Sequence, residues 1–209
     1  EALSDGEMGY IHFPDTYMGS ATFFPHYFYA QIRKEGLIID GRFNSGGLDP
    51  YIFLRRLNTK PMAYFTRRYS HDQTIPPTTT QAEMICITNK YAGSGGDMLP
   101  FEFRKLGMGQ VIGTTTWGGL VGVSQFISLI DGGMLTAPDY RIYDDEGEWI
   151  IENEGVKPDV KVELDAVKMQ EGHDTQLRKA IDMLQQQMDE TGDKWPEHDE
   201  FIDDETFTE

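Results

Sequence analysis

The fold is decided by CITNKYAGSGGD, residues 86–97. An apolar run from Met84 to Thr88 is typical of a buried strand, and a helix is predicted to begin near Asp97. Glycines on both sides of Ser94 let the backbone adopt positive φ and turn sharply. A serine on such a turn lies beside backbone N–H groups and at the positive end of the following helix. This arrangement indicates a nucleophilic serine on an α/β scaffold.

The local pattern also permits a simpler interpretation. Ala92 stands where the first glycine of a G-x-S-x-G elbow would be. Short motifs of this kind recur by chance. On the pattern alone, a glycine-rich loop with an incidental serine therefore stays open.

A second glycine-rich turn, DGRFNSGG, lies at residues 40–47. It follows the apolar run Leu37 to Ile39, which is typical of a strand buried on both faces. Ligand sites in parallel sheets form at the carboxyl ends of strands, so we expect both turns to face one cleft. Gly46 and Gly47 are then candidate oxyanion donors beside the N–H of Gly95.

Apolar runs alternate with helical patterns along the first half of the chain, which predicts βαβ units and a mainly parallel sheet. Strands are expected at residues 9–13, 37–39, 62–66, 84–88 and 111–113, and helices at 21–34, 51–58 and 97–106. The proline- and threonine-rich residues 70–81 are predicted to form a surface loop. Short strands are expected at residues 123–130, 134–137, 140–143, 148–151 and 160–164, before a helix at 174–188. We expect an α/β domain at 1–188 and an acidic tail at 189–209.

The charge of the chain limits its partners. Its 209 residues contain 18 Lys and Arg against 35 Asp and Glu, giving a net charge of −17 at pH 7. This balance argues against nucleic acid or anionic lipid as the main partner. Residues 189–209 carry −9 of that charge and are expected to be a solvated, partly disordered tail, with a partner-binding tail as the alternative.

Other compositional signals exclude further classes of site. Cys86 is the only cysteine, so no intrachain disulfide can form. No run of 18 apolar residues is present, which argues against membrane insertion. The sequence has no metal-ligand spacing, and the Gly46-Gly47 turn lacks the Lys-Ser/Thr of a phosphate loop. We therefore expect no cofactor.

Four motifs together resemble a known family. They are DGRFNSGG at 40–47, YAGSGGD at 91–97, IGTTTWGG at 112–119 and ENEGVKPD at 152–159. In order and spacing they resemble the tricorn core proteases, within the tail-specific (carboxyl-terminal processing) serine peptidases. The resemblance covers about residues 9–184. It implies a crotonase-like (ClpP/crotonase) layered α/β fold and a serine peptidase that forms an acyl-enzyme.

The resemblance also implies roles for individual residues. Ser94 corresponds to the nucleophile, and the N–H groups of Gly95 and of Gly46 or Gly47 correspond to the oxyanion donors. Glu152 corresponds to the acidic residue that supports the site through a polar relay, with a simple turn acid as the alternative. Peptide or protein substrates, a homo-oligomer and a cytoplasmic location are implied, with periplasmic export as the alternative.

The chain lacks the lysine that serves as the general base in the processing peptidases. Those enzymes place a lysine shortly after a Thr-x-Gly motif, whereas residues 116–120 read TWGGL. Tricorn-like enzymes use a histidine that precedes the first strand, so we expect the base before Glu1 and little activity in these 209 residues alone. No pattern favours a catalytic role for His12, His26, His71, His173 or His198. A non-catalytic peptide-binding or assembly module of the same fold is the alternative.

Cleavage preference does not follow from the resemblance. Gly95 stands where tricorn has an aspartate after the serine. A backbone amide is retained, so the expected oxyanion role of Gly95 is unaffected.

Overall fold

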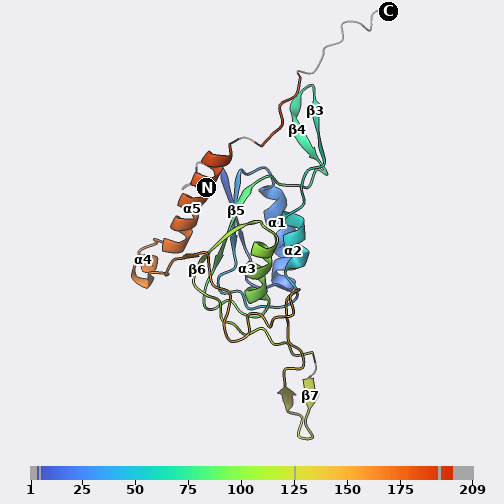
Figure 1. Ribbon diagram of the computed structural model, residues 1–209, viewed down its shortest axis with the longest axis vertical. Helices are drawn as coiled ribbons and strands as arrows, with labels where there is room; N and C mark the ends of the chain where they lie inside the picture. The colour runs from blue at the N-terminus through green and yellow to red at the C-terminus, as the bar shows by residue number, and fades with distance from the viewer. Residues whose placement is uncertain (1–3, 5, 125, 193, 200–209) are drawn as a thin grey trace, which may run out of the picture.

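A five-stranded parallel sheet forms the centre of the computed structural model, which describes residues 4, 6–124, 126–192 and 194–199 (Figure 1). Its strand order is β1-β2-β5-β6-β9. The strands are β1 (Met8–His12), β2 (Gly36–Asp40), β5 (Glu83–Thr88), β6 (Gly109–Gly113) and β9 (Val160–Lys161). The predicted α/β class with a mainly parallel sheet is confirmed.

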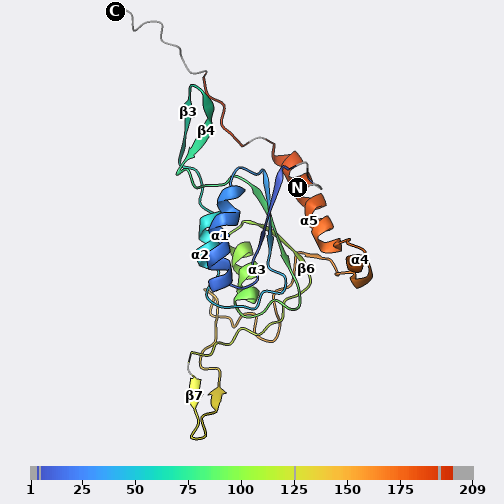
Figure 2. The ribbon, with the colours of Figure 1, turned by 180° about the vertical axis from the view of Figure 1, so that it is seen from behind.

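Helices cover both faces of this sheet (Figures 1 and 2). One face carries α1 (Met18–Ala30), α2 (Tyr51–Leu57) and α3 (Gly95–Lys105), and the other carries α5 (Thr175–Thr191). Side chains alternate between the faces along a strand. In β2, Leu37 and Ile39 pack in the core under α1–α3, and Ile38 packs with Leu184 of α5. Burial on both faces explains why β2 reads as a continuous apolar run.

The predicted surface loop at 70–81 is wrong for its first half. Strands β3 (Ala63–Arg67) and β4 (Ser70–Ile75) form an antiparallel hairpin that projects from one end of the molecule (Figure 1). The sequence of β4 is polar because most of its side chains are partly or fully exposed. Its pairing rests on backbone hydrogen bonds to β3, which leave no apolar signature.

The region after residue 119 contains less regular structure than predicted. Strands β7 (Phe126–Ser128) and β8 (Met134–Thr136) form a hairpin at the end opposite β3 and β4. The strands expected at 140–143 and 148–151 are reduced to isolated bridges. A short helix, α4 (Ala166–Gln170), was not predicted; the Asp165 carboxylate accepts hydrogen bonds from its first N–H groups.

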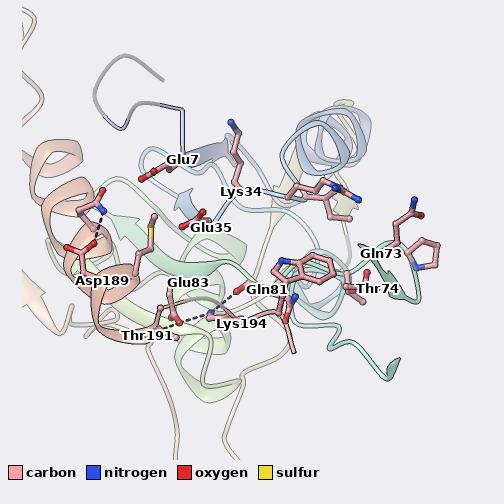
Figure 3. A pocket seen from close by; sticks show the side chains of 18 residues that line it. Glu7, Lys34, Glu35, Gln73, Thr74, Gln81, Glu83, Asp189, Thr191 and Lys194 are labelled. Carbon is pink, nitrogen blue, oxygen red and sulfur yellow. Dashed lines mark hydrogen bonds and ion pairs between the residues drawn. The ribbon is translucent and has the colours of Figure 1, made fainter. Parts of the chain in front are cut away.

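The predicted tail begins inside helix α5, which continues to Thr191. The residues that follow contact two strands: Lys194 forms a 2.6 Å ion pair with Glu83 of β5, and the Trp195 ring lies against Tyr64 of β3. A cavity of about 800 Å³ lies beside this segment (Figure 3). Its lining includes Lys34 and Glu35. Residues 200–209 of the predicted tail lie outside the described residues.

No helix within the described ranges has the length and hydropathy needed to cross a membrane. Across the same residues, no cluster of three or more His, Cys, Asp and Glu side chains is arranged to hold a metal ion.

Candidate active site

Ser94 lies at the elbow between β5 and α3. Its φ of 57° and ψ of −116° are an uncommon conformation for a residue with a side chain. The Ser94 N–H donates to the Gly119 carbonyl at 3.0 Å and to Asp97 Oδ2 at 2.7 Å. The Ser94 carbonyl accepts hydrogen bonds from the N–H groups of Asp97 and Met98. The elbow is therefore fixed by its backbone, while the side chain remains half-buried.

The two glycine-rich turns meet at this elbow. A Cβ added to Gly46 would lie 2.7 Å from the Cβ of Ser94, so glycine is required for the close approach. A Cβ added to Gly95 would lie 2.0 Å from Thr16 Oγ1 and 2.9 Å from the carbonyl of Leu48. The chain after β2 thus packs directly against the start of α3, at the carboxyl edge of the sheet.

The three candidate oxyanion donors differ in their hydrogen bonds. The Gly46 N–H donates to Asn44 Oδ1 at 2.8 Å and is already paired. Gly47 forms a parallel bridge with Thr16, whose backbone bonds the Gly46 carbonyl and the Leu48 N–H. In this parallel bridge Thr16 bonds the two neighbours of Gly47, so the N–H group of Gly47 itself points away from Thr16. Among the described residues, no acceptor is present for the N–H groups of Gly47 and Gly95.

Asn44 joins the two turns and was not singled out from the sequence. Its side chain is completely buried, its Nδ2 donates to the Phe13 carbonyl at 2.7 Å, and its own carbonyl accepts from the Gly93 N–H at 3.1 Å. A buried amide with each group paired fixes both loops. The available signal was an asparagine within a glycine-rich turn.

Glu152 supports a third loop beside Ser94. Its Oε2 accepts hydrogen bonds from the N–H groups of Leu120 at 2.6 Å and Val121 at 2.7 Å. This loop also carries Gly119, whose carbonyl accepts from the Ser94 N–H. The Glu152 carboxylate makes no direct hydrogen bond to Ser94 in the described part of the chain, so their connection runs through the loop backbone.

None of the five histidines forms a hydrogen bond with Ser94 among the described residues. His12 lies on β1, where its Nε2 is 3.4 Å from the Arg42 carbonyl oxygen. His26 is exposed on α1, and His71 is exposed on β4 of the hairpin that the sequence interpreted as a loop. His173 is exposed before α5, and His198 lies 2.8 Å from Asp72.

Exposed aromatic rings surround the serine elbow. Phe43 and Tyr91 stack with centroids 5.3 Å apart and planes 10° apart, yet both remain more than half exposed. Trp117 is 69% exposed and lies against Gly93, where an added Cβ would be 2.5 Å from the indole ring. Sequence reasoning did not select these rings, because an exposed aromatic side chain has no periodic signature.

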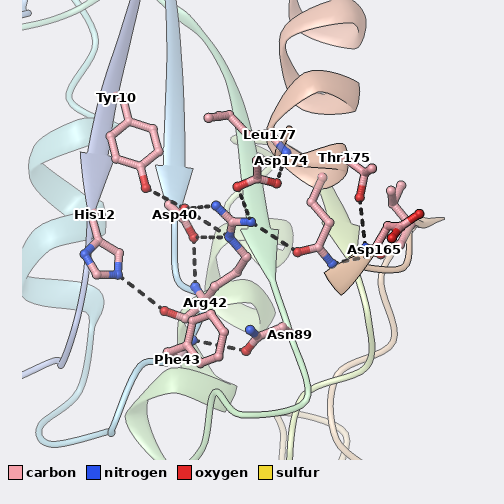
Figure 4. A network of polar contacts seen from close by, with 12 residues as sticks. Tyr10, His12, Asp40, Arg42, Phe43, Asn89, Asp165, Asp174, Thr175 and Leu177 are labelled. Carbon is pink, nitrogen blue, oxygen red and sulfur yellow. Dashed lines mark hydrogen bonds and ion pairs between the residues drawn. The ribbon is translucent and has the colours of Figure 1, made fainter. Parts of the chain in front are cut away.

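A buried ionic network holds the turn after β2 against α5 (Figure 4). Arg42 is 7% exposed and pairs with Asp40 and Asp174, each through an N–O distance of 2.7 Å. The Tyr10 hydroxyl donates to Asp40 Oδ2 at 2.6 Å, and Arg42 also contacts Gln176 Oε1 at 3.3 Å. Burial is the main reason that the pKa of Tyr10 is raised, with the Asp40 charge next. This network anchors the start of the turn that ends at Gly47.

The neighbouring carboxyl groups of Glu102 and Asp49 predict how stability depends on pH. Burial, followed by the neighbouring Asp49 carboxylate, raises the pKa of Glu102 from 4.5 to about 8. The folded-state pKa is the higher one, so this stabilising contribution is complete below pH 4.5 and is lost as pH rises through about 8. The thermal unfolding midpoint should therefore decrease as pH is raised from 5 to 9. Glu102→Gln should flatten that dependence, while the exposed control Glu171→Gln should retain it; equal slopes in wild type and Glu102→Gln would contradict the assignment.

A serine on a strand–helix elbow lies here beside N–H groups of two glycine turns that have no acceptor among the described residues, an arrangement typical of serine hydrolases. The model of peptidase family S41 matches residues 7–162, and the chain belongs to this family. The four-motif resemblance found in the sequence is therefore confirmed.

Comparison with individual proteins shows similarity to tricorn proteases within this family. The chain is 38% identical to the tricorn protease of Thermoplasma acidophilum over 93% of its own length and 18% of that relative. It is 36% identical to a putative tricorn-like protease C-terminal subunit of Sulfurisphaera tokodaii, over 90% of this chain and 22% of that protein. The chain thus spans about a fifth of the curated relatives it matches.

Solved structures agree with this relationship. The crystal structure of the tricorn protease matches with a TM-score of 0.85 and 38% identity, covering 90% of this chain and 18% of that one. The photosystem II D1 C-terminal processing protease matches with a TM-score of 0.55 at 20% identity, covering 75% of this chain and 42% of that one. The second likeness concerns the fold alone.

Proposed function

We propose that this chain is a tricorn-like serine peptidase core that hydrolyses peptides through an acyl-enzyme on Ser94. The observation that carries the proposal is the strained Ser94 elbow beside the N–H groups of Gly47 and Gly95, which have no acceptor in the described part of the chain. The Ser94 Oγ attacks the peptide carbonyl carbon while its proton passes to a base. Collapse of the tetrahedral intermediate expels the amine, which takes up that proton, and water then hydrolyses the ester.

The proposed oxyanion hole consists of the N–H groups of Gly47 and Gly95. Gly95 opens helix α3, where backbone N–H groups lack helical partners and carry partial positive charge. Loss of one such donor costs roughly 10²–10³ in kcat in serine hydrolases. Gly46 contributes differently in this proposal, because its own N–H is paired with Asn44 and its lack of a Cβ makes room for Ser94.

Glu152 is proposed to support the site as an acceptor for loop N–H groups. Glu152→Ala would leave the N–H groups of Leu120 and Val121 without their acceptor, so we expect kcat to fall by about 10-fold or more. Both bonds go to one oxygen, which a glutamine also has, so Glu152→Gln should retain most of kcat. Steady-state kinetics on the two variants test this; equal losses would show that the negative charge is essential instead.

The general base is proposed to be a histidine outside these 209 residues. This proposal is supported by the absence of a histidine hydrogen bond to Ser94 among the described residues. We expect the 209-residue chain to be weakly active and the longest natural polypeptide that contains it to be active. Robust hydrolysis by the 209-residue chain, abolished by Ser94→Ala, would contradict this and return attention to its own histidines.

Peptide or protein substrates are proposed, together with self-association. The exposed rings of Phe43, Tyr91 and Trp117 offer apolar surface for a substrate chain beside Ser94. The exposed apolar side chains of the β7–β8 hairpin favour a homo-oligomer. We also propose that residues 1–188 are the catalytic core and 189–209 an appended acidic segment.

A mixture of defined peptides tests the proposed function. Mass spectrometry of products from the longest natural polypeptide should reveal new peptide termini, and a peptide boronate that forms a tetrahedral adduct with serine should suppress them. Product formation that is insensitive to both the boronate and Ser94→Ala would reject the peptidase proposal. Peptide binding without any product would favour the alternative, a binding module.

A further inference from the structure

We propose that Asp97 is a positioning residue of the peptidase site, because its carboxylate fixes the Ser94 elbow and the loop at Gly118 relative to each other. The inference rests on the proposed function of Ser94. Asp97 is the third residue of α3 and is completely buried. A negative charge in the first turn of a helix is favoured by the helix dipole.

The two carboxylate oxygens bind different parts of the chain. Asp97 Oδ2 accepts the Ser94 N–H at 2.7 Å, and Oδ1 accepts the Gly118 N–H at 2.8 Å. An ionised carboxylate can accept at both oxygens, whereas an amide side chain has only one acceptor oxygen. A residue that only capped the helix would not need the second bond, to a loop 21 residues away.

The strained elbow depends on these contacts. A non-glycine residue at positive φ persists only where its surroundings over-determine it. The Ser94 N–H has two acceptors, Asp97 Oδ2 and the Gly119 carbonyl. Asp97 affects both acceptors: its Oδ2 is one of them, and its Oδ1 binds the N–H of Gly118, the residue next to Gly119. Removing this one carboxylate therefore loosens both restraints on the nucleophile.

The opposite side of the same loop is held by Glu152. Glu152 accepts the N–H groups of Leu120 and Val121, and Asp97 accepts that of Gly118. Four consecutive residues, 118–121, are thus held between two carboxylates. Burial raises the pKa of Asp97, and hydrogen bonds from Thr116, Gly118 and Ser94 oppose that rise. These donors match an ionised acceptor.

The proposed role predicts a loss in chemistry without a loss in substrate binding. Asp97→Asn keeps the shape but turns an NH₂ group toward one of the two N–H donors. We expect kcat to fall about 10- to 100-fold while KM stays within about threefold. Affinity for a peptide boronate, which requires an aligned Ser94 and oxyanion hole, should fall in parallel with kcat. Affinity for a non-cleavable peptide should not change.

Two comparisons make the test specific. Asp165→Asn is the matched control, because Asp165 likewise accepts two backbone N–H groups, those of Val167 and Lys168, but lies at α4; its kcat should equal wild type. Asp97→Glu keeps the charge and should recover part of the kcat lost in Asp97→Asn. If Asp97→Asn does not fold, Asp97→Glu is judged against wild type by the same KM, boronate and peptide criteria.

The outcomes separate this inference from the proposed function. A kcat of Asp97→Asn within threefold of wild type would overturn the inference. Equal losses of peptide affinity and boronate affinity would also overturn it, because they indicate general disruption. Activity that survives Ser94→Ala would instead reject the proposed function, whatever Asp97 variants do.

Discussion

Ser94→Ala is expected to lower kcat for peptide hydrolysis by about 10⁴- to 10⁶-fold in the longest natural polypeptide that contains these residues. The reason is that the substitution removes the Ser94 Oγ, the proposed nucleophile that would form the acyl-enzyme. The backbone bonds that hold the elbow use the Ser94 N–H and carbonyl, which alanine retains. The unfolding midpoint should therefore stay close to wild type while hydrolysis is lost, as measured by peptide kinetics and thermal denaturation.

Ser70→Ala is the matched control for this substitution. Ser70 is exposed on β4, in the hairpin that projects away from the site, and its replacement should leave kcat unchanged. Peptide hydrolysis in Ser94→Ala at more than a tenth of the wild-type rate would rule out Ser94 as the nucleophile.

Arg42→Met is expected to cause the largest loss of stability, about 3–5 kcal/mol in the free energy of unfolding. The substitution leaves Asp40, which is 1% exposed, without its cation and also deprives Asp174 at the start of α5. Burying unpaired charge costs more than the salt bridge itself contributes. Because α5 covers one face of the sheet, the loss should appear as reduced cooperativity and a lower midpoint in urea denaturation.

The control for Arg42→Met is Arg178→Met on the exposed side of α5. Surface substitutions of this kind change the free energy of unfolding by about 0.5 kcal/mol or less. Similar small losses for both variants would show that the buried network at Arg42 contributes little to stability.

The sequence predicted the sheet because its central strands are buried on both faces. Leu37 to Ile39 and Met84 to Thr88 are unbroken apolar runs, and the structure places them side by side in β2 and β5. Strand β4 was missed because its polar residues pair through the backbone. Helix α4 was missed because it is short and buries none of its residues.

The candidate site was predictable in its parts and unpredictable in its connections. Ser94 and the glycines could be predicted because a glycine-rich turn is recognisable from a few neighbouring residues. Each of the three connecting side chains has a partner 21 to 32 residues away in the sequence: Gly118 for Asp97, Phe13 for Asn44 and Leu120 for Glu152. Local patterns cannot show which N–H group is already paired, and this distinction separates Gly46 from Gly47.

The proposed role of Ser94 as nucleophile is tested most directly by mapping, residue by residue, the sites labelled by a fluorophosphonate probe, which reacts with activated serines. The longest natural polypeptide containing this chain would be labelled, digested and analysed by mass spectrometry. We expect a single phosphonylated residue, Ser94, with no adduct in heat-denatured protein or in Ser94→Ala. An adduct on another serine, or none at all in a preparation that hydrolyses peptides, would contradict the proposed role.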